Sequence, residues 1–163
     1  MKEIIYKPIG IVHTPHESTN NMPIQPSSAK GIKGTVEVYP EYETGLKDLT
    51  GFSHIILIYH FHLSNRYQLE VKPFLDKNLH GVFATRAPKR PNNVGISVVK
   101  LIKIVRNVLH IENVDIINGT PLLDIKPFVP DFDAAVNIKI GWLTESKHKM
   151  SNQKSDGRFD FYF

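Results

Sequence analysis

The chain has 163 residues, a length typical of one domain, and its 41% hydrophobic content argues against disorder. It has no cysteine, which excludes disulfides, thiolate zinc sites, iron–sulfur clusters and cysteine nucleophiles. The chain has twenty lysines and arginines and sixteen acidic residues, and the resulting net charge of +4 permits an anionic partner.

Strand signals dominate the chain. Residues 32–39 alternate apolar and polar side chains with a period of two. Residues 53–62 are rich in Ile, Tyr and Phe, which is typical of a strand buried on both faces. The remaining predicted strands are short and separated by turn residues, and they cover 80–85, 97–105, 108–116, 122–128 and 136–142.

Helix signals are few. About two turns are predicted at 41–49, after Pro40 and before Gly51, and one more at 65–70. Residues 19–30 form a polar, proline-rich loop, which at this length is more often functional than idle. Many short strands with few helices predict an all-β fold, a single closed or partly open β-barrel with a few short helices.

His60 and His62 flank one phenylalanine. Because side chains of a strand alternate between its faces, both imidazoles would point the same way and could ligate a metal ion. The sequence shows neither a third ligand nor a second shell, so we predict that no metal is bound.

Two loops stand out for their chemistry. One carries Arg86, Lys89 and Arg90 between stiffening prolines, a pattern that suits a phosphate or carboxylate as well as it suits a solvated turn. The other begins at Gly119, where the backbone can approach a ligand closely, and leads to Asp124 and Lys126, which could pair on one strand face. The residues alone therefore indicate a basic β domain whose loops could hold an anion or a nucleotide.

Four stretches, in this order, resemble the TsaA-like family of S-adenosyl-L-methionine-dependent tRNA adenine-N6 methyltransferases. They are PIGIVHTP (8–15), GLKDLTGFSH (45–54), GVFATRAPKRPN (81–92) and GTPLLDIKP (119–127). The resemblance covers about residues 4–143, although this chain has Asn93-Val94 and Asn118 where the family more often has Pro-Ile and Asp. It implies a barrel that is not a Rossmann methyltransferase, a homodimer with donor sites near the subunit interface, and N6-threonylcarbamoyladenosine at tRNA position 37 as substrate.

Carried over residue by residue, the resemblance implies a site for S-adenosyl-L-methionine. It would be formed by Pro26, Ser27, Ser28, His62, Leu63, Arg86, Val98, Asn118, Gly119, Thr120, Pro121 and Leu122. Arg86 would face the carboxylate of the donor or a tRNA phosphate, and Lys89 and Arg90 would contact tRNA phosphates. The acceptor nitrogen must lose a proton, and the candidate bases are His62, Asp124 and Tyr59.

We predict a barrel domain over residues 1–143 and a basic, aromatic tail over 144–163, ending in a last strand or docking segment at 158–163. The apolar run 53–61 and the tail offer more hydrophobic surface than one small barrel hides, which also favours a homodimer. We see no signal peptide or membrane helix, so we expect a cytoplasmic protein without a membrane partner. Two alternatives stay open: a noncatalytic tRNA-binding barrel, and a methyltransferase acting on another substrate.

Overall fold

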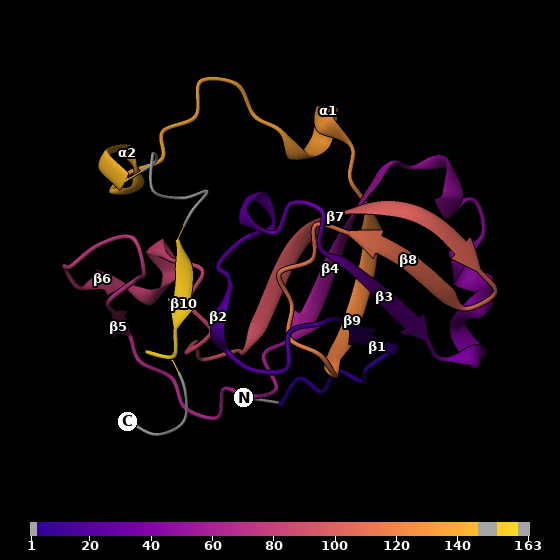
Figure 1. The fold of residues 1–163 in the computed structure, drawn as a ribbon, viewed down its shortest axis with the longest axis horizontal. Coiled ribbons are helices and arrows are strands. Elements are labelled where there is room, and N and C mark those ends of the chain that lie inside the picture. The colour runs from indigo at the N-terminus through magenta and orange to yellow at the C-terminus, as the bar shows by residue number, and fades with distance from the viewer. Residues whose placement is uncertain (1–2, 147–152, 160–163) are drawn as a thin grey trace.

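The computed structural model describes residues 3–146 and 153–159. Six strands close into a barrel in the order β1-β3-β8-β7-β4-β9, and every neighbouring pair is antiparallel (Figure 1). The predicted mainly β barrel is confirmed, and it is a closed one. Its strands are β1 (Gly10–His13), β3 (Lys33–Val38), β4 (His54–His60), β7 (Val94–Val105), β8 (Val108–Glu112) and β9 (Thr120–Pro127).

The barrel encloses the main hydrophobic core. Alternate residues of each strand point inward, as the period of two requires, and the inward positions carry branched apolar side chains. Burying these side chains supplies most of the folding free energy of the barrel. The core consists of Val12, Val36, Val38, Ile55, Leu57, Tyr59, Val99, Leu101, Leu109, Ile111, Val114, Ile116 and Leu122.

A smaller accessory lobe stands beside the barrel, formed by residues 61–93, 142–146 and 153–159. In it β5 (Glu70–Val71) pairs with β6 (His80–Gly81), and β10 (Lys154–Asp156) pairs with β2 (Asn20–Pro23), which lies in the long polar loop (Figure 1). Its core is small: Val71, Val82 and Ala87 are buried, and Phe159 packs against them.

The helices are short and mostly of the 3-10 type. The predicted helix at 41–49 appears as η2 (Pro40–Leu46) and η3 (Leu49–Gly51), because Asp48 adopts a left-handed conformation (φ 65°) that interrupts it. The prediction of one helical turn at 65–70 is wrong, because those residues form no helix. The other helices are η1 (Pro26–Ser28), η4 (Val82–Ala84), α1 (Pro130–Asp133) and α2 (Leu143–Ser146). Within the described ranges, no helix is long and apolar enough to cross a membrane.

One predicted strand is absent. Residues 136–142 belong to an extended arm, residues 129–142, that leaves β9 and reaches α2 without joining a sheet (Figure 1). Val136 is 88% exposed and Ile138 65% exposed. An alternating segment forms a strand only against a partner, and a closed barrel offers no free edge.

Three strand predictions need smaller corrections. The run 80–85 is a two-residue strand followed by η4, and β8 ends at Glu112 instead of 116. β4 is fully buried on one face only, because its outward residues are half-buried. The boundary between 143 and 144 stays a prediction. Of the final segment 158–163, Arg158 and Phe159 dock on the accessory lobe, and residues 160–163 lie outside the described residues.

Candidate active site

Four of the predicted site residues, His62, Asn118, Gly119 and Thr120, meet at one mouth of the barrel. β4 ends there at His60, and a tight turn follows in which the His62 N–H donates to the His60 carbonyl at 2.8 Å. The turn brings His62 Nδ1 to 3.4 Å from Thr120 Oγ1 at the start of β9. Two segments distant in the sequence are thereby joined at the mouth.

The turn before β9 is held by backbone and amide contacts. Gly119 has a φ of +76°, a conformation that favours glycine, and its N–H donates to the Val12 carbonyl at 2.9 Å. Asn118 Nδ2 donates to Glu17 Oε1 at 3.0 Å, and Asn118 Oδ1 accepts from the Thr14 N–H at 3.2 Å. The Asn118 side chain therefore ties the turn to the loop after β1.

The hydrogen bonds of Thr120 fix the tautomer of His62. The Thr120 hydroxyl donates to the Ile117 carbonyl at 2.7 Å, so Thr120 Oγ1 can only accept from His62, and His62 Nδ1 must carry the proton. Burial, with a smaller effect from His60, lowers the pKa of His62 below its ordinary value. His62 is therefore neutral at pH 7, with an unprotonated Nε2.

A hydrogen-bonded network joins the buried Tyr59 and Ser97 to the half-buried Asp115. Tyr59 Oη lies 3.1 Å from Ser97 Oγ, and Ser97 Oγ donates to Asp115 Oδ1 at 2.7 Å. Burial raises the pKa of Asp115 to about 6, against the weaker effect of its hydrogen bond from Ser97 and of the Arg86 charge. Burial and the neighbouring Asp115 charge raise the pKa of Tyr59, so Tyr59 stays protonated and is a poor base. Sequence reasoning missed Ser97 and Asp115.

The basic loop is tightly bound to itself. Arg90 Nη1 donates to the carbonyls of Val82 at 3.1 Å and Thr85 at 2.9 Å, and it also reaches the Ala87 carbonyl. Lys89 is only 9% exposed, whereas Arg86 is exposed. Lys89 and Arg90 are thus not the fully solvated side chains of the alternative interpretation, and their phosphate contacts stay a prediction. Arg86 therefore becomes the strongest candidate in this loop for binding an anion.

The remaining predicted cofactor-site residues lie on four elements: η1, the turn after His62, β7 and β9. Ser27 on η1 is exposed, with Pro26 and Ser28 half-buried beside it, and Leu63 follows His62 on the surface of the same turn. η1 and β7, which carries the half-buried Val98, lie close together, and Pro121 is half-buried in β9.

Two predicted residues do not line the mouth. The Leu122 side chain belongs to the barrel core, and its carbonyl accepts from the Ile9 N–H at 2.8 Å. Asp124 forms the expected ion pair with Lys126, at 2.7 Å, which raises the pKa of that lysine and leaves Asp124 a weak base candidate.

His60 and His62 do not share a strand face, because β4 ends between them; that premise was wrong. Across 3–146 and 153–159, no three His, Asp or Glu side chains are placed to hold a metal ion.

Comparison with known proteins agrees with this fold. The model of the tRNA-methyltransferase O N-terminal domain matches residues 11–134, which include the whole mouth. A Pyrococcus abyssi protein named as a probable S-adenosyl-L-methionine-binding protein is 56% identical over 156 residues, 96% of this chain and 85% of its own length. The tRNA (adenine(37)-N6)-methyltransferase of Mus musculus is 33% identical over 84% of this chain.

The crystal structure of TrmO from Pseudomonas aeruginosa superimposes with a TM-score of 0.73 at 34% identity, over 86% of this chain. This chain spans 63% of that crystallised chain and 33% of the mouse enzyme. The structure is therefore a mainly β barrel of the methyltransferase kind and not a Rossmann fold. The chain belongs to the tRNA-methyltransferase O family, as its motifs predicted.

Proposed function

We propose that the protein is an S-adenosyl-L-methionine-dependent tRNA adenine-N6 methyltransferase, and that its substrate is N6-threonylcarbamoyladenosine at position 37. The observation that carries the proposal is the contact of His62 with Thr120 at one barrel mouth, inside the range that the family model matches. The names of the Pyrococcus and mouse relatives support the same cofactor and reaction.

The residues of the mouth fit the cofactor. S-adenosyl-L-methionine supplies a methyl group on a positively charged sulfur, so its site should not place a second cation against that sulfur. Burial lowers the pKa of His62, so His62 adds no cation at the mouth. The Arg86 guanidinium suits the carboxylate of the amino acid end, and the exposed hydroxyl of Ser27 suits polar groups.

Three candidate bases reduce to one. The carbamoyl group on N6 withdraws its lone pair and makes its N–H more acidic, so removing that proton favours transfer. Tyr59 stays protonated, and Asp124 is paired with Lys126. His62 has an unprotonated Nε2 and a ring oriented by Thr120, so His62 accepts the N6 proton in this proposal.

Nucleoside mass spectrometry tests the proposal. Threonylcarbamoylated tRNA and labelled S-adenosyl-L-methionine should give the labelled N6-methyl derivative, and the rate should fall as acidic pH protonates His62. His62→Gln should slow transfer by about 100-fold or more while binding cofactor, and should lose that acidic limb. Unmodified tRNA with bound cofactor would indicate another substrate, and tRNA binding without cofactor would indicate a noncatalytic barrel.

We further propose a cytoplasmic homodimer. The predicted basis for dimerisation was partly wrong, because the inward side chains of β4 are hidden inside the barrel. Exposed apolar side chains of the arm supply a different one, namely Phe132, Val136, Ile138 and Ile140. Sedimentation should give twice the chain mass, and Val136→Asp with Ile138→Asp should halve it. A wild-type mass near 18.6 kDa at micromolar concentration would contradict the dimer.

A further inference from the structure

The loop from Val82 to Arg90 is built to be rigid. Val82 and Ala87 are buried in the accessory core, and the Trp142 indole N–H donates to the Ala84 carbonyl at 2.9 Å. Thr85 closes the loop from within, because its hydroxyl donates to the Val82 carbonyl at 2.8 Å. Together with the carbonyl contacts of Arg90, these bonds leave the loop little freedom to move.

Phe83 is the exception in this loop. Its neighbour Val82 is fully buried, yet Phe83 itself is 74% exposed. The Arg90 guanidinium carbon lies 5.8 Å from the centroid of the Phe83 ring, within the range of a cation–π contact. One face of the ring is therefore supported by a cation that the loop carbonyls hold in place, and the ring stands on a fixed base.

The loop also reaches the barrel mouth. The Ser64 hydroxyl, two residues after His62, donates to the Pro88 carbonyl at 3.2 Å, which ties the loop to the turn at the mouth. A ligand that runs from the mouth along this loop would pass the exposed ring of Phe83. Its surroundings are cationic, since Arg86, Lys89 and Arg90 share the loop.

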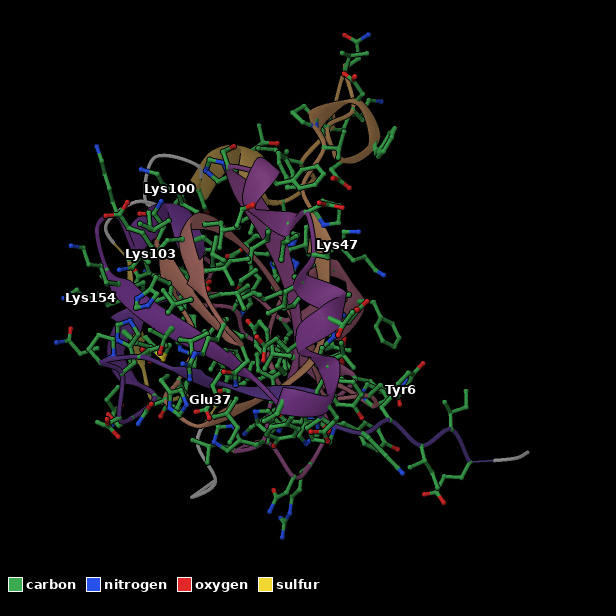
Figure 2. The ribbon with its side chains drawn as sticks, turned by 90° about the vertical axis from the view of Figure 1, so that its right-hand side faces the viewer. Tyr6, Glu37, Lys47, Lys100, Lys103 and Lys154 are labelled. Atoms are coloured by element: carbon green, nitrogen blue, oxygen red, sulfur yellow. The ribbon has the colours of Figure 1, made fainter. Side chains whose placement is uncertain are left out.

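We propose that the exposed face of Phe83 stacks on an unpaired base of the tRNA, beside the base at the barrel mouth. This inference rests on the proposed function for its partner. Proteins hold single-stranded nucleotides by combining cations with exposed aromatic rings, because every base has a π-face. A fixed ring on a cationic loop that is tied to the barrel mouth meets that requirement. Basic side chains elsewhere, including Lys100, Lys103 and Lys154 on one side of the molecule, would contact only phosphates (Figure 2).

Binding of an anticodon stem-loop RNA tests the inference, with fluorescence anisotropy as the measurement. Phe83→Ala should weaken binding roughly 5- to 100-fold, the range expected for one lost base stack. Phe83→Tyr should restore wild-type affinity. Tyr6→Ala is the matched control, because Tyr6 is 71% exposed and lies away from these lysines, and it should leave affinity unchanged (Figure 2). A fully paired RNA duplex should not distinguish Phe83→Ala from wild type.

Several outcomes would overturn the inference: wild-type affinity in Phe83→Ala, an equal loss on the duplex, or no stem-loop binding by the wild type. A fall in sedimentation mass of Phe83→Ala would also overturn it, because the ring would then belong to a contact between two copies of the chain. If the stem-loop pattern holds and mass spectrometry finds no methylated nucleoside, the proposed reaction fails and the stacking site remains.

Discussion

The barrel and the accessory lobe are stabilised in different ways. The barrel encloses a continuous apolar core behind an unbroken ring of paired strands. The lobe has a very small core and depends on single polar contacts, such as Ser146 Oγ to the Leu75 carbonyl at 2.8 Å and Arg158 Nη1 to the Pro73 carbonyl at 2.8 Å. The barrel strands carry Tyr59 and Ser97 of the hydrogen-bonded network, and the lobe presents the loop that we assign to binding.

Two glycine substitutions give the strongest test of this difference in packing between the barrel and the lobe. A Cβ at Gly95 would lie 2.6 Å from Tyr59 Cζ and 2.8 Å from Phe61 Cζ, so Gly95→Ala should cost about 3 kcal/mol or more. Gly81→Ala in the lobe meets nothing within 4 Å and should change stability by less than about 0.5 kcal/mol. Urea unfolding measures both, and equal costs would contradict the packing described for the barrel.

A second pair compares the two cores. Leu57→Ala empties a fully buried position of the barrel and should lower the free energy of global unfolding by about 3 kcal/mol. Val82 is also fully buried, but we expect Val82→Ala to lower stability by only about 2 kcal/mol, mainly through local opening of the lobe. Native-state hydrogen exchange separates the cases: amides of β5 and β6 should open with less free energy than those of β4. Identical exchange in both regions would mean that the protein unfolds as one unit.

The Asp115 network gives the barrel a pH dependence. The folded protein holds the Asp115 proton with a pKa of about 6, above the ordinary aspartate value of 3.8. Protonated Asp115 stabilises the folded protein fully below pH 3.8, the ordinary pKa of aspartate, and this stabilisation is lost as the pH rises through 6. Between about pH 4 and pH 7 the wild type should lose up to roughly 3 kcal/mol relative to Asp115→Asn. Parallel stability curves for the two proteins would contradict the burial of this carboxyl.

The smallest expected effect concerns the lobe alone. Trp142→Phe removes the indole donor to the Ala84 carbonyl and keeps an aromatic ring for the stack on His80, whose centroid lies 4.5 Å away. The loss should be about 1 kcal/mol, confined to exchange of residues 82–87, with the barrel amides unchanged. A loss of barrel protection would show that the lobe and the barrel are coupled more tightly than their contacts indicate.

Much of the barrel could be predicted from the sequence because most of its strands have an alternating or a continuously apolar pattern, although β1 was not predicted. β3, β4, β7 and β9 all lie within two or three residues of their predicted positions. The same signal failed at 136–142, where the pattern is present but no strand is available to pair with it. Local sequence patterns report which face of a segment is apolar, whereas strand pairing depends on the rest of the fold.

The candidate site was predictable only where a motif marked it. Arg86 and Gly119 lie in stretches with a family resemblance, whereas His62 lies outside all four of them and was assigned through the resemblance as a whole. The structure brings the segments of His62 and Gly119 together. The Tyr59–Ser97–Asp115 network could not be found in this way, because its members come from separate segments and meet only once the barrel has closed. The internal role of Arg90 was hidden for a similar reason: a guanidinium that binds carbonyls looks like any surface cation in a sequence.

The pairing of β1 with β9 bears on how the protein is made. Gly10 lies opposite Leu122, so the first barrel strand to leave the ribosome waits for the last before the ring can close. Until β9 has been made and has paired with β1, the strand β1 presents an unpaired edge to which other chains can add. A nascent chain stalled before residue 120 would keep such an edge exposed, and we expect it to associate with other chains more readily than one released after Pro127.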